Sequence, residues 1–304
     1  MKVLITGASG FIGGHVVNCC LNKSLNHTYA LITRNSNLTA LNEISNIKYI
    51  KGSLDDLDTI KNELLDFSPD VCIHLAWSGI PNYSPQISTY NLNISVNLTD
   101  FLLNNTKCKK IIVSGSCFEY GKASGECRES DPVKLDSYVA WAKHSLYKYS
   151  LLRCIEKSVD LYWLRFFYVY GSFQRSDSLI PTIVNTFKNL GKPDIKFPFN
   201  ANDFVYVEDI ADAIRIILDS KPNPGIYNLG SGAPTSVIDI CEIIERKICN
   251  STNFSDSLRS QEKCNNTTSF WANTKKATTL LNWEPKVSIY KGVEKQIETI
   301  LNKT

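Results

Sequence analysis

Three glycines near the start of the chain, Gly7, Gly10 and Gly13, constrain the possible fold more than any other feature of the sequence. They follow residues 3–5, a short apolar run that is typical of a buried parallel strand. A helix with an apolar face begins directly after them. This order brings backbone N–H groups and the positive end of a helix dipole to one point, which suits a bound diphosphate. The alternative is an ordinary glycine-rich turn between a strand and a helix.

Each glycine has an expected role in such a site. Gly7 lets the chain turn, Gly10 lets the backbone approach the pyrophosphate, and Gly13 lets the helix pack on the strand. The pattern therefore predicts a dinucleotide-binding fold, in which Phe11 and Ile12 add further amides to the phosphate site.

The rest of the chain alternates strand and helix patterns, which is typical of a doubly wound parallel α/β sheet. Residues 29–32, 47–50, 71–76, 109–113, 204–207 and 226–229 are predicted strands, and 91–105, 138–157, 237–249 and 275–281 are predicted helices. We expect about seven strands in the main sheet. The predicted dinucleotide-binding domain comprises residues 1–171 with 204–230 returning to it. Residues 172–203 and 231–304 form a smaller α/β domain for the substrate, with ligands in the cleft between the two.

Composition excludes several classes of protein. The net charge is +3 over 304 residues and no basic block occurs, so nucleic acid is not an expected partner. Because no long apolar run or leader pattern is present, we expect a cytoplasmic protein without a membrane span. Ten cysteines occur without a Cys-x-x-Cys pair, so no metal site is expected.

The end of the second predicted strand favours one cofactor. An acidic residue there would bind the ribose 2′-hydroxyl of NAD, whereas an arginine accommodates the 2′-phosphate of NADP. Here the strand ends in Thr33 and Arg34. We therefore expect NADP(H), with NAD(H) as the alternative and a solvated surface arginine as the simpler interpretation. His74, within an apolar strand, is interpreted as a core histidine rather than a catalytic base.

Several motifs in order along the chain resemble the extended short-chain dehydrogenase/reductases, the NAD(P)-dependent nucleotide-sugar epimerases, dehydratases and reductases. The motifs are Gly7-x-x-Gly10-x-x-Gly13, His74-Leu75-Ala76, Ser116 to Gly121, the helix with Tyr138 and Lys143, residues 165–171, 202–211 and 227–232, and Leu281 to Pro285. The resemblance covers almost the whole chain. It implies a nucleotide-diphosphate sugar as substrate and a homodimer formed through the 91–105 and 138–157 helices.

By this resemblance the catalytic residues are Ser116, Tyr138 and Lys143. The family spaces the tyrosine four residues before the lysine, on one helix face. Here the spacing is five, and Val139 occupies the family's tyrosine position. Tyr138 could precede the regular helix, or a π-bulge could absorb the extra residue. Otherwise another residue is the acid, or catalysis is impaired. Tyr147 and Tyr149 are interpreted as packing residues.

The loop after Ser116 separates the possible reactions. Family dehydratases carry an Asp-Glu pair directly after this hydroxyl, but here Cys117 and Phe118 stand there, with Glu119 one position late. This argues against a 4,6-dehydratase. Reduction of a 4-keto-6-deoxy sugar and 4-epimerisation remain, and Arg34 favours the reductase. The chain resembles reductases that make CDP-abequose or dTDP-fucose for surface polysaccharides. A non-catalytic NADP-binding regulator is a third hypothesis.

The resemblance also assigns binding residues. The expected cofactor contacts are Gly7, Gly10, Phe11, Ile12, Gly13, Thr33, Arg34, Ser53, Leu54, Leu75, Ala76, Trp77, Asn93, Tyr138, Lys143 and Tyr168. The expected substrate contacts are Ser116, Cys117, Phe118, Tyr168, Arg175, Leu179, Asn202 and Arg259. Many family members have arginine where this chain has Asn202, and Arg259 is the candidate replacement. A solvated surface charge is an equally simple interpretation of Arg175.

Overall fold

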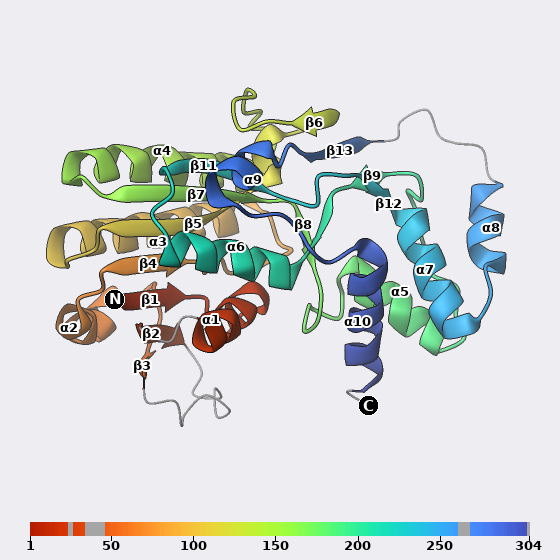
Figure 1. The fold of residues 1–304 in the computed structure, drawn as a ribbon, viewed down its shortest axis with the longest axis horizontal. Helices are drawn as coiled ribbons and strands as arrows, with labels where there is room; N and C mark the ends of the chain where they lie inside the picture. The colour runs from red at the N-terminus through yellow and green to blue at the C-terminus, as the bar shows by residue number, and fades with distance from the viewer. Residues whose placement is uncertain (24–26, 34–45, 261–267, 303–304) are drawn as a thin grey trace. The chain divides into compact units, whose positions relative to one another are not determined.

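The computed structural model describes residues 1–23, 27–33, 46–260 and 268–302 (Figure 1). The chain divides into two compact units. The first comprises Met1–Lys122, Asp131–Arg165 and Ala211–Tyr227, and the second comprises Ala123–Ser130, Phe166–Ile210 and Asn228–Thr304. The two units are described in turn.

A seven-stranded parallel sheet organises the first unit, as the sequence predicts. The strand order is β11-β7-β5-β4-β1-β2-β3. The bounds are β1 Lys2–Thr6, β2 Thr28–Thr33, β3 Ile47–Lys51, β4 Val71–His74, β5 Lys110–Ser116, β7 Asp160–Phe166 and β11 Gly225–Leu229. The chain builds outward from β1 to β3 and then returns to place β4 on the other side of β1. The point where the order reverses, between β1 and β4, is where open α/β sheets bind ligands.

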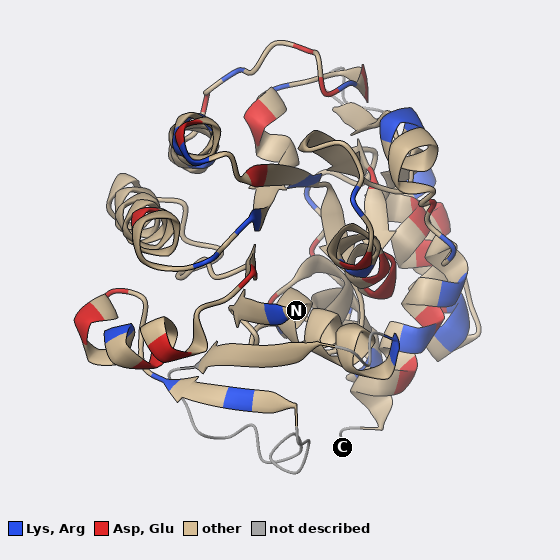
Figure 2. Cartoon of the chain, turned by 60° about the vertical axis from the view of Figure 1, so that its left-hand side comes forward, with Lys and Arg blue, Asp and Glu red and all other residues tan. Residues whose placement is uncertain are grey.

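In the part of the chain that the structure describes, five helices pack on this sheet: α1 Phe11–Lys23, α2 Leu57–Phe67, α3 Pro85–Asn105, α4 Tyr138–Lys157 and α6 Val207–Asp219. Figure 1 shows α1 and α6 on the near side of the sheet, where Lys23 and Asp212 form an ion pair of 3.2 Å. On the other face, α2, α3 and α4 bury one apolar side each. Leu64, Leu102 and Leu146 are among the residues that pack into this core with side chains of the sheet. Most charged segments lie on helices and loops, and the strands carry few (Figure 2).

A lysine side chain caps one of these helices from inside the protein. Lys110 on β5 is buried, and its Nζ donates to the carbonyl oxygens of Ile217, Leu218 and Ser220 at 2.6, 3.3 and 2.7 Å. These carbonyls end α6 and lack intrahelical partners, so the ammonium satisfies them and complements the helix dipole. The contact fixes the end of α6 against β5.

The second unit is built from short strands and five helices among its described residues. The helices are α5 Leu179–Lys188, α7 Val237–Cys249, α8 Asn253–Arg259, α9 Lys275–Leu281 and α10 Ile289–Leu301. The strands are β6 Gly125–Cys127, β8 Tyr168–Tyr170, β9 Ala201–Asn202, β10 Phe204–Tyr206, β12 Thr235–Ser236 and β13 Ser269–Ala272. They pair as a two-stranded sheet, β10-β8, and a four-stranded sheet, β12-β9-β13-β6. Its core combines α5, α7 and α10, with Ile183, Ile240 and Val293 among the buried members.

Most predicted elements match the structure, but several boundaries differ, and β5 runs on to Ser116 where the predicted strand ends at residue 113. Helix α3 begins at Pro85, ahead of the predicted start at residue 91. Ser84 caps it by accepting a hydrogen bond from the Ile87 amide, and Pro85 suits the first helical position. Strand β4 ends at His74, short of the predicted residue 76.

Candidate active site

The glycine turn joins β1 to α1 at the point where the strand order reverses. Gly7 has φ +72°, and a Cβ there would lie 2.8 Å from the Ala76 amide nitrogen. A Cβ on Gly13 would lie 2.0 Å from the Gly7 carbonyl oxygen. The first helical hydrogen bond runs from the Gly14 amide to the Gly10 carbonyl at 2.9 Å. The amides just before it open the helix without intrahelical acceptors, which fits a diphosphate in this cradle.

His74, at the end of β4, is held on both ring nitrogens. Ser95 Oγ donates to the Asn91 carbonyl at 2.7 Å, so it accepts from His74 Nε2 at 2.9 Å. Nδ1 therefore accepts from Thr6 Oγ1 at 2.7 Å. Burial, and secondarily the charge of Lys143, lowers the pKa of His74 to about 3. The ring is neutral near pH 7 and is engaged as a core residue.

The loop after β4 is fastened to α3 by a residue that the sequence analysis did not single out. Buried Asn91 accepts from the Ser78 amide at 2.7 Å and donates to the Ser78 and Ile87 carbonyls at 3.0 and 2.8 Å. Asn93, the predicted cofactor contact on the same helix, is exposed. Asn91 thus fixes the loop that carries Leu75, Ala76 and Trp77.

Lys143 is buried and faces β5 and the β4 loop. Its Nζ donates to the Ser114 carbonyl at 2.6 Å and to Ser114 Oγ at 3.2 Å. The same ammonium lies 3.9 Å from the centre of the Trp77 ring, a cation–π contact. Burial lowers the pKa of Lys143 to about 7, although the Glu119 carboxylate acts in the opposite direction. A charge that can be lost near neutral pH thus lies at the carboxyl end of the sheet.

Helix α4 is regular from Tyr138 to Lys157, so the π-bulge considered from the sequence is absent. Ser137 caps the helix by accepting from the Ala140 amide at 3.3 Å, which makes Tyr138 its first residue. Tyr138 is 56% exposed. Val139, four residues before Lys143 and therefore on its face of the helix, is buried.

Ser116 lies at the end of β5 and caps the short 3-10 helix η2, Cys117–Tyr120. Its Oγ accepts a hydrogen bond from the Phe118 amide at 3.1 Å. The hydroxyl proton is then available to a second acceptor. Ser114 and Ser116 are two residues apart in β5, so their side chains lie on the same face of the strand. Because the Lys143 ammonium contacts Ser114, it lies on the same face as the Ser116 hydroxyl.

Glu119 points inward from η2 and is fully buried. Its Oε1 accepts from the Ser116 amide at 3.0 Å and from Trp163 Nε1 at 2.8 Å, and its Oε2 accepts from Arg165 Nε at 3.1 Å. Burial raises the pKa of Glu119, but His144, Arg165 and Trp163 outweigh it, and the pKa lies below its ordinary value. The carboxylate is ionised and turned away from solvent.

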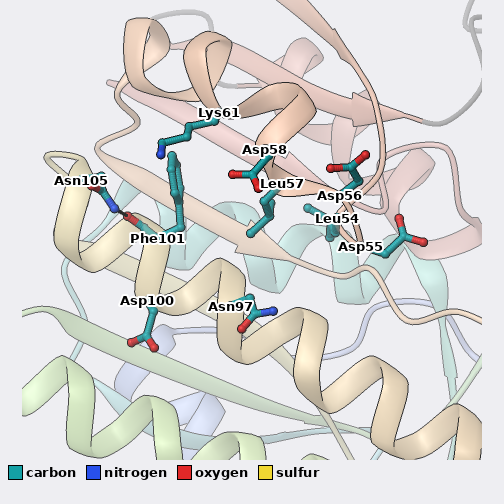
Figure 3. Close-up of a pocket in the computed structure, with 10 residues that line it drawn as sticks. All are labelled: Leu54, Asp55, Asp56, Leu57, Asp58, Lys61, Asn97, Asp100, Phe101 and Asn105. Carbon is teal, nitrogen blue, oxygen red and sulfur yellow. Dashed lines mark hydrogen bonds between the residues drawn. The ribbon is translucent and has the colours of Figure 1, made fainter.

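A pocket of about 370 Å³ lies between the β3–α2 segment and α3 (Figure 3). The lining residues include Leu54, a predicted cofactor contact, and the apolar side chains of Leu57 and Phe101. The charged lining residues are Asp55, Asp56, Asp58, Asp100 and Lys61. Four carboxylates against one ammonium make this wall unsuited to a phosphate group.

The remaining predicted substrate contacts lie in the second unit. Tyr168 packs against Phe204 and Phe270, with ring centres 5.6 and 6.0 Å apart. Arg175 pairs with Asp177 at 3.2 Å. Leu179 is the first residue of α5, and Asn202 lies in β9.

Arg259, the candidate replacement for a diphosphate-binding arginine, ends α8. Its Nη2 is 2.7 Å from both Asp239 Oδ1 and Glu242 Oε2 on α7. A diphosphate would compete with these two carboxylates for the guanidinium.

Arg34, on which the expected preference for NADP(H) rests, lies outside the described residues. Thr33 ends β2 at the edge of the same segment. Within the described ranges, no group of histidine, cysteine, aspartate or glutamate side chains is arranged to hold a metal ion. No helix in those ranges is both long and apolar enough to span a bilayer.

A glycine turn at the switch point of a doubly wound sheet defines a dinucleotide-binding fold. The model of the NAD dependent epimerase/dehydratase family matches residues 3–230. The chain belongs to this family.

Relatives in the family catalyse different reactions, as their names state. The chain is 29% identical over 317 residues to a UDP-glucuronate 4-epimerase of Thermodesulfobacterium geofontis, covering 97% of this chain and 94% of that one. It is 26% identical over 316 residues to a dTDP-4-dehydro-6-deoxyglucose reductase of Escherichia coli, covering 98% and 97%. The crystal structure of UDP-glucuronic acid 4-epimerase from Bacillus cereus with NAD matches with a TM-score of 0.81 at 24% identity, over 99% and 96% of the chains. This structure shows the shared fold.

Proposed function

We propose that the protein is an NADPH-dependent reductase of a nucleotide-activated 4-keto-6-deoxy sugar, linked to dTDP, CDP or GDP, in surface polysaccharide synthesis in the cytoplasm. The observation that carries the proposal is the inward orientation of Glu119. Elimination of water needs a base for a C–H proton and an acid for the leaving hydroxyl. Cys117 and Phe118 follow Ser116, and the one carboxylate of η2 is committed to Arg165 and Trp163. Dehydration is therefore disfavoured.

In this proposal three residues act on the reacting oxygen of the sugar. The Ser116 hydroxyl donates to the carbonyl oxygen, where negative charge develops during reduction. The positive charge of Lys143 favours that oxyanion and the phenolate of a nearby tyrosine. Tyr138 is the proton donor, and it must reach around the first turn of α4 to act with Lys143. NADPH, when bound, supplies the hydride.

Aromatic side chains beside Ser116 support a 6-deoxy sugar. The Phe118 ring packs edge to face on Tyr83 with ring centres 5.7 Å apart. Because the Phe118 amide bonds to Ser116 Oγ, this aromatic pair lies next to the hydroxyl proposed to hold the sugar. An apolar wall suits a methyl group better than a hydroxymethyl or a carboxylate. The full-length similarity to a dTDP-4-dehydro-6-deoxyglucose reductase supports the same reading.

The second candidate is an NAD-retaining nucleotide-sugar 4-epimerase. The relative named UDP-glucuronate 4-epimerase, similar over nearly the whole chain, favours it. The two activities differ in cofactor use, because an epimerase restores its cofactor in each cycle and a reductase consumes one NADPH per sugar.

The deciding experiment follows NADPH absorbance with 4-keto-6-deoxy sugars linked to dTDP, CDP, GDP and UDP. We expect steady loss of one NADPH per sugar with one of the nucleotides, faster than with NADH. Tightly retained NAD and interconversion of 4-epimers without net oxidation would instead establish the epimerase. Absence of all turnover while NADPH binds would favour a non-catalytic regulator.

A further inference from the structure

The Glu119 carboxylate joins three elements around the proposed active site. It accepts from the Ser116 amide in its own loop, and from Trp163 and Arg165 on β7. On α4, His144 Nδ1 lies 3.8 Å from Oε2, longer than a hydrogen bond, and His144 directly follows Lys143. One buried group therefore contacts the Ser116 loop, the neighbouring strand and the helix of the catalytic lysine.

The two bonds at Ser116 act together as a capping box. Ser116 Oγ accepts from the Phe118 amide, while the Ser116 amide donates to Glu119 Oε1. Backbone and side chain of the serine are thus both fixed. The hydroxyl oxygen keeps one position, and its proton is the part left to rotate toward a substrate.

The absence of a side chain at Gly115 leaves space for the Glu119 carboxylate and its partner Trp163. A Cβ on Gly115 would lie 2.4 Å from Trp163 Nε1 and 2.9 Å from Glu119 Oε1. Arg165, the partner of Glu119, is also buried, and its Nη1 donates to the Tyr120 hydroxyl at 2.9 Å. Because Glu119 has no exposed surface, it cannot touch a substrate.

We propose that Glu119 is a positioning residue, whose carboxylate holds the Ser116 loop so that the serine hydroxyl is presented to the reacting oxygen of the sugar in one orientation. The inference rests on the proposed function, since it assigns Ser116 to the sugar oxygen. It predicts that Glu119 affects the reaction through Ser116 and not through cofactor binding.

The test is a double-mutant cycle of Glu119→Gln and Ser116→Ala in the full chain, measured by kcat, KM for the keto sugar and NADPH affinity. In glutamine only one of the two terminal atoms accepts hydrogen bonds. The charged Arg165 competes for that oxygen, and the Ser116 amide loses its acceptor. We expect Glu119→Gln to lower kcat about tenfold when Ser116 is present but less than twofold in the Ser116→Ala background. KM and NADPH affinity should change less than threefold.

The matched control is Tyr120→Phe, which removes the Arg165 contact from the same network and leaves both Ser116 bonds in place. Its effect on kcat should be the same in both backgrounds. If Glu119→Gln does not fold, Gly115→Ala replaces it in the cycle, since its added Cβ displaces the carboxylate without removing charge. Equal effects of Glu119→Gln in the two backgrounds, or failure of both variants to fold, would overturn the proposal.

Failure of the proposed function gives a different result. If the wild type interconverts 4-epimers and consumes no NADPH, the reductase proposal is wrong, and the same cycle is measured on epimerisation. If the wild type turns over keto sugars but the cycle shows no coupling, only the positioning role is wrong. If the wild type has no turnover at all, both proposals are wrong.

Discussion

Lys143 shows at the scale of one residue how burial and function are linked. The side chain is 6% exposed, and its ammonium is held by the Ser114 carbonyl and hydroxyl and by the face of Trp77. Removal from water disfavours the charged form, so the pKa lies at about 7 rather than at its ordinary 10.5. A group with such a shift makes stability depend on pH.

We predict that the wild type gains stability relative to a Lys143→Met variant as the pH rises above about 7. Below that pH, lysine is protonated in both folded and unfolded chains. Between about 7 and 10.5 the unfolded chain holds the proton and the folded chain releases it. The difference in unfolding free energy should therefore grow with pH, by about 1.4 kcal/mol per unit. Denaturant titrations at pH 7, 8 and 9 measure it.

The control for this prediction is Lys148→Met, an exposed lysine on the same helix. Its stability difference from the wild type should stay constant over the same pH range. A constant difference for Lys143→Met as well would show that the buried ammonium keeps its proton.

Individual site residues could be predicted from the sequence only where they belong to a short motif with a characteristic spacing. The resemblance supplied Ser116 and Lys143 as candidates. It did not supply Ser114 or the pairing of Glu119 with Arg165. These contacts arise because β5 and β7 lie side by side in the sheet, and no local sequence pattern indicates them. One signal was available: Arg165 lies in the apolar run of residues 161–167, where a charge is expected to have a buried partner.

At the scale of elements, the β1–α1 turn depends on how closely its helix approaches its strand. The geometry leaves no room at Gly13, where a Cβ would lie 2.0 Å from the Gly7 carbonyl. At Gly14, the next residue of α1, a Cβ would lie 3.8 Å from the Ala8 carbonyl, an ordinary contact. The two glycines thus differ in what they tolerate.

We predict that Gly13→Ala displaces α1 and lowers NADPH affinity by about tenfold or more, equivalent to about 1.4 kcal/mol. It should also destabilise the fold by about 1–3 kcal/mol through overpacking. Gly14→Ala should keep cofactor affinity and be neutral or stabilising. Cofactor titration by calorimetry compares them, and equal affinities would show that the turn does not hold the cofactor.

The first turn of α4 makes a second prediction at this scale. Tyr138 is the proposed proton donor, but Val139 occupies the position four residues before Lys143, on the same face of the helix. We expect Tyr138→Phe to lower kcat about 100-fold, as for loss of a general acid. Adding Val139→Tyr to that variant should restore part of the activity, because it places a phenol four residues before Lys143.

Steady-state rates with one keto sugar compare the wild type, Tyr138→Phe and the variant that also carries Val139→Tyr. Full activity of Tyr138→Phe would remove Tyr138 from the mechanism. The prediction rests on proposed catalysis, so it is measured after the substrate has been found.

Element boundaries were predictable where apolar periodicity and caps agreed. Helices α7 and α9 have the predicted bounds, and β11 returns to the main sheet as predicted. The alternative of a π-bulge between Tyr138 and Lys143 is wrong, because Ser137 caps α4 at Tyr138 and the helix continues without interruption.

At the scale of the whole molecule, α4 carries exposed apolar side chains that support the proposed homodimer. Leu152 is 63% exposed and Ile155 is 67% exposed. They lie three residues apart, on one side of the helix. Apolar groups this exposed on a helix that packs with α3 suit an interface with a second copy.

We predict that Leu152→Glu with Ile155→Glu converts a dimer into a single chain of 34.2 kDa. The charges would be buried without partners in the proposed interface. Light scattering coupled to size exclusion measures the mass. Leu190→Glu, at a residue 96% exposed in the second unit, should leave the mass unchanged. A wild type that is already monomeric would contradict the proposal.

The doubly wound parallel sheet was predictable because a glycine turn followed by alternating strands and helices admits few arrangements. The strand pairing within the second unit was not. Its four-stranded sheet pairs β6 with β13, segments far apart in the chain, through two-to-four-residue strands. Strands this short carry no readable alternation.

The buried lysine that caps α6 has a consequence for chemical labelling. Because Lys110 Nζ is occupied by three carbonyl oxygens inside the protein, acylating reagents cannot reach it while α6 stays in place. Its labelling rate therefore reports how often α6 detaches from β5. In a mass-spectrometric footprint, Lys110 should remain unmodified long after surface lysines have reacted, and its delayed modification would time the detachment of α6 from the sheet.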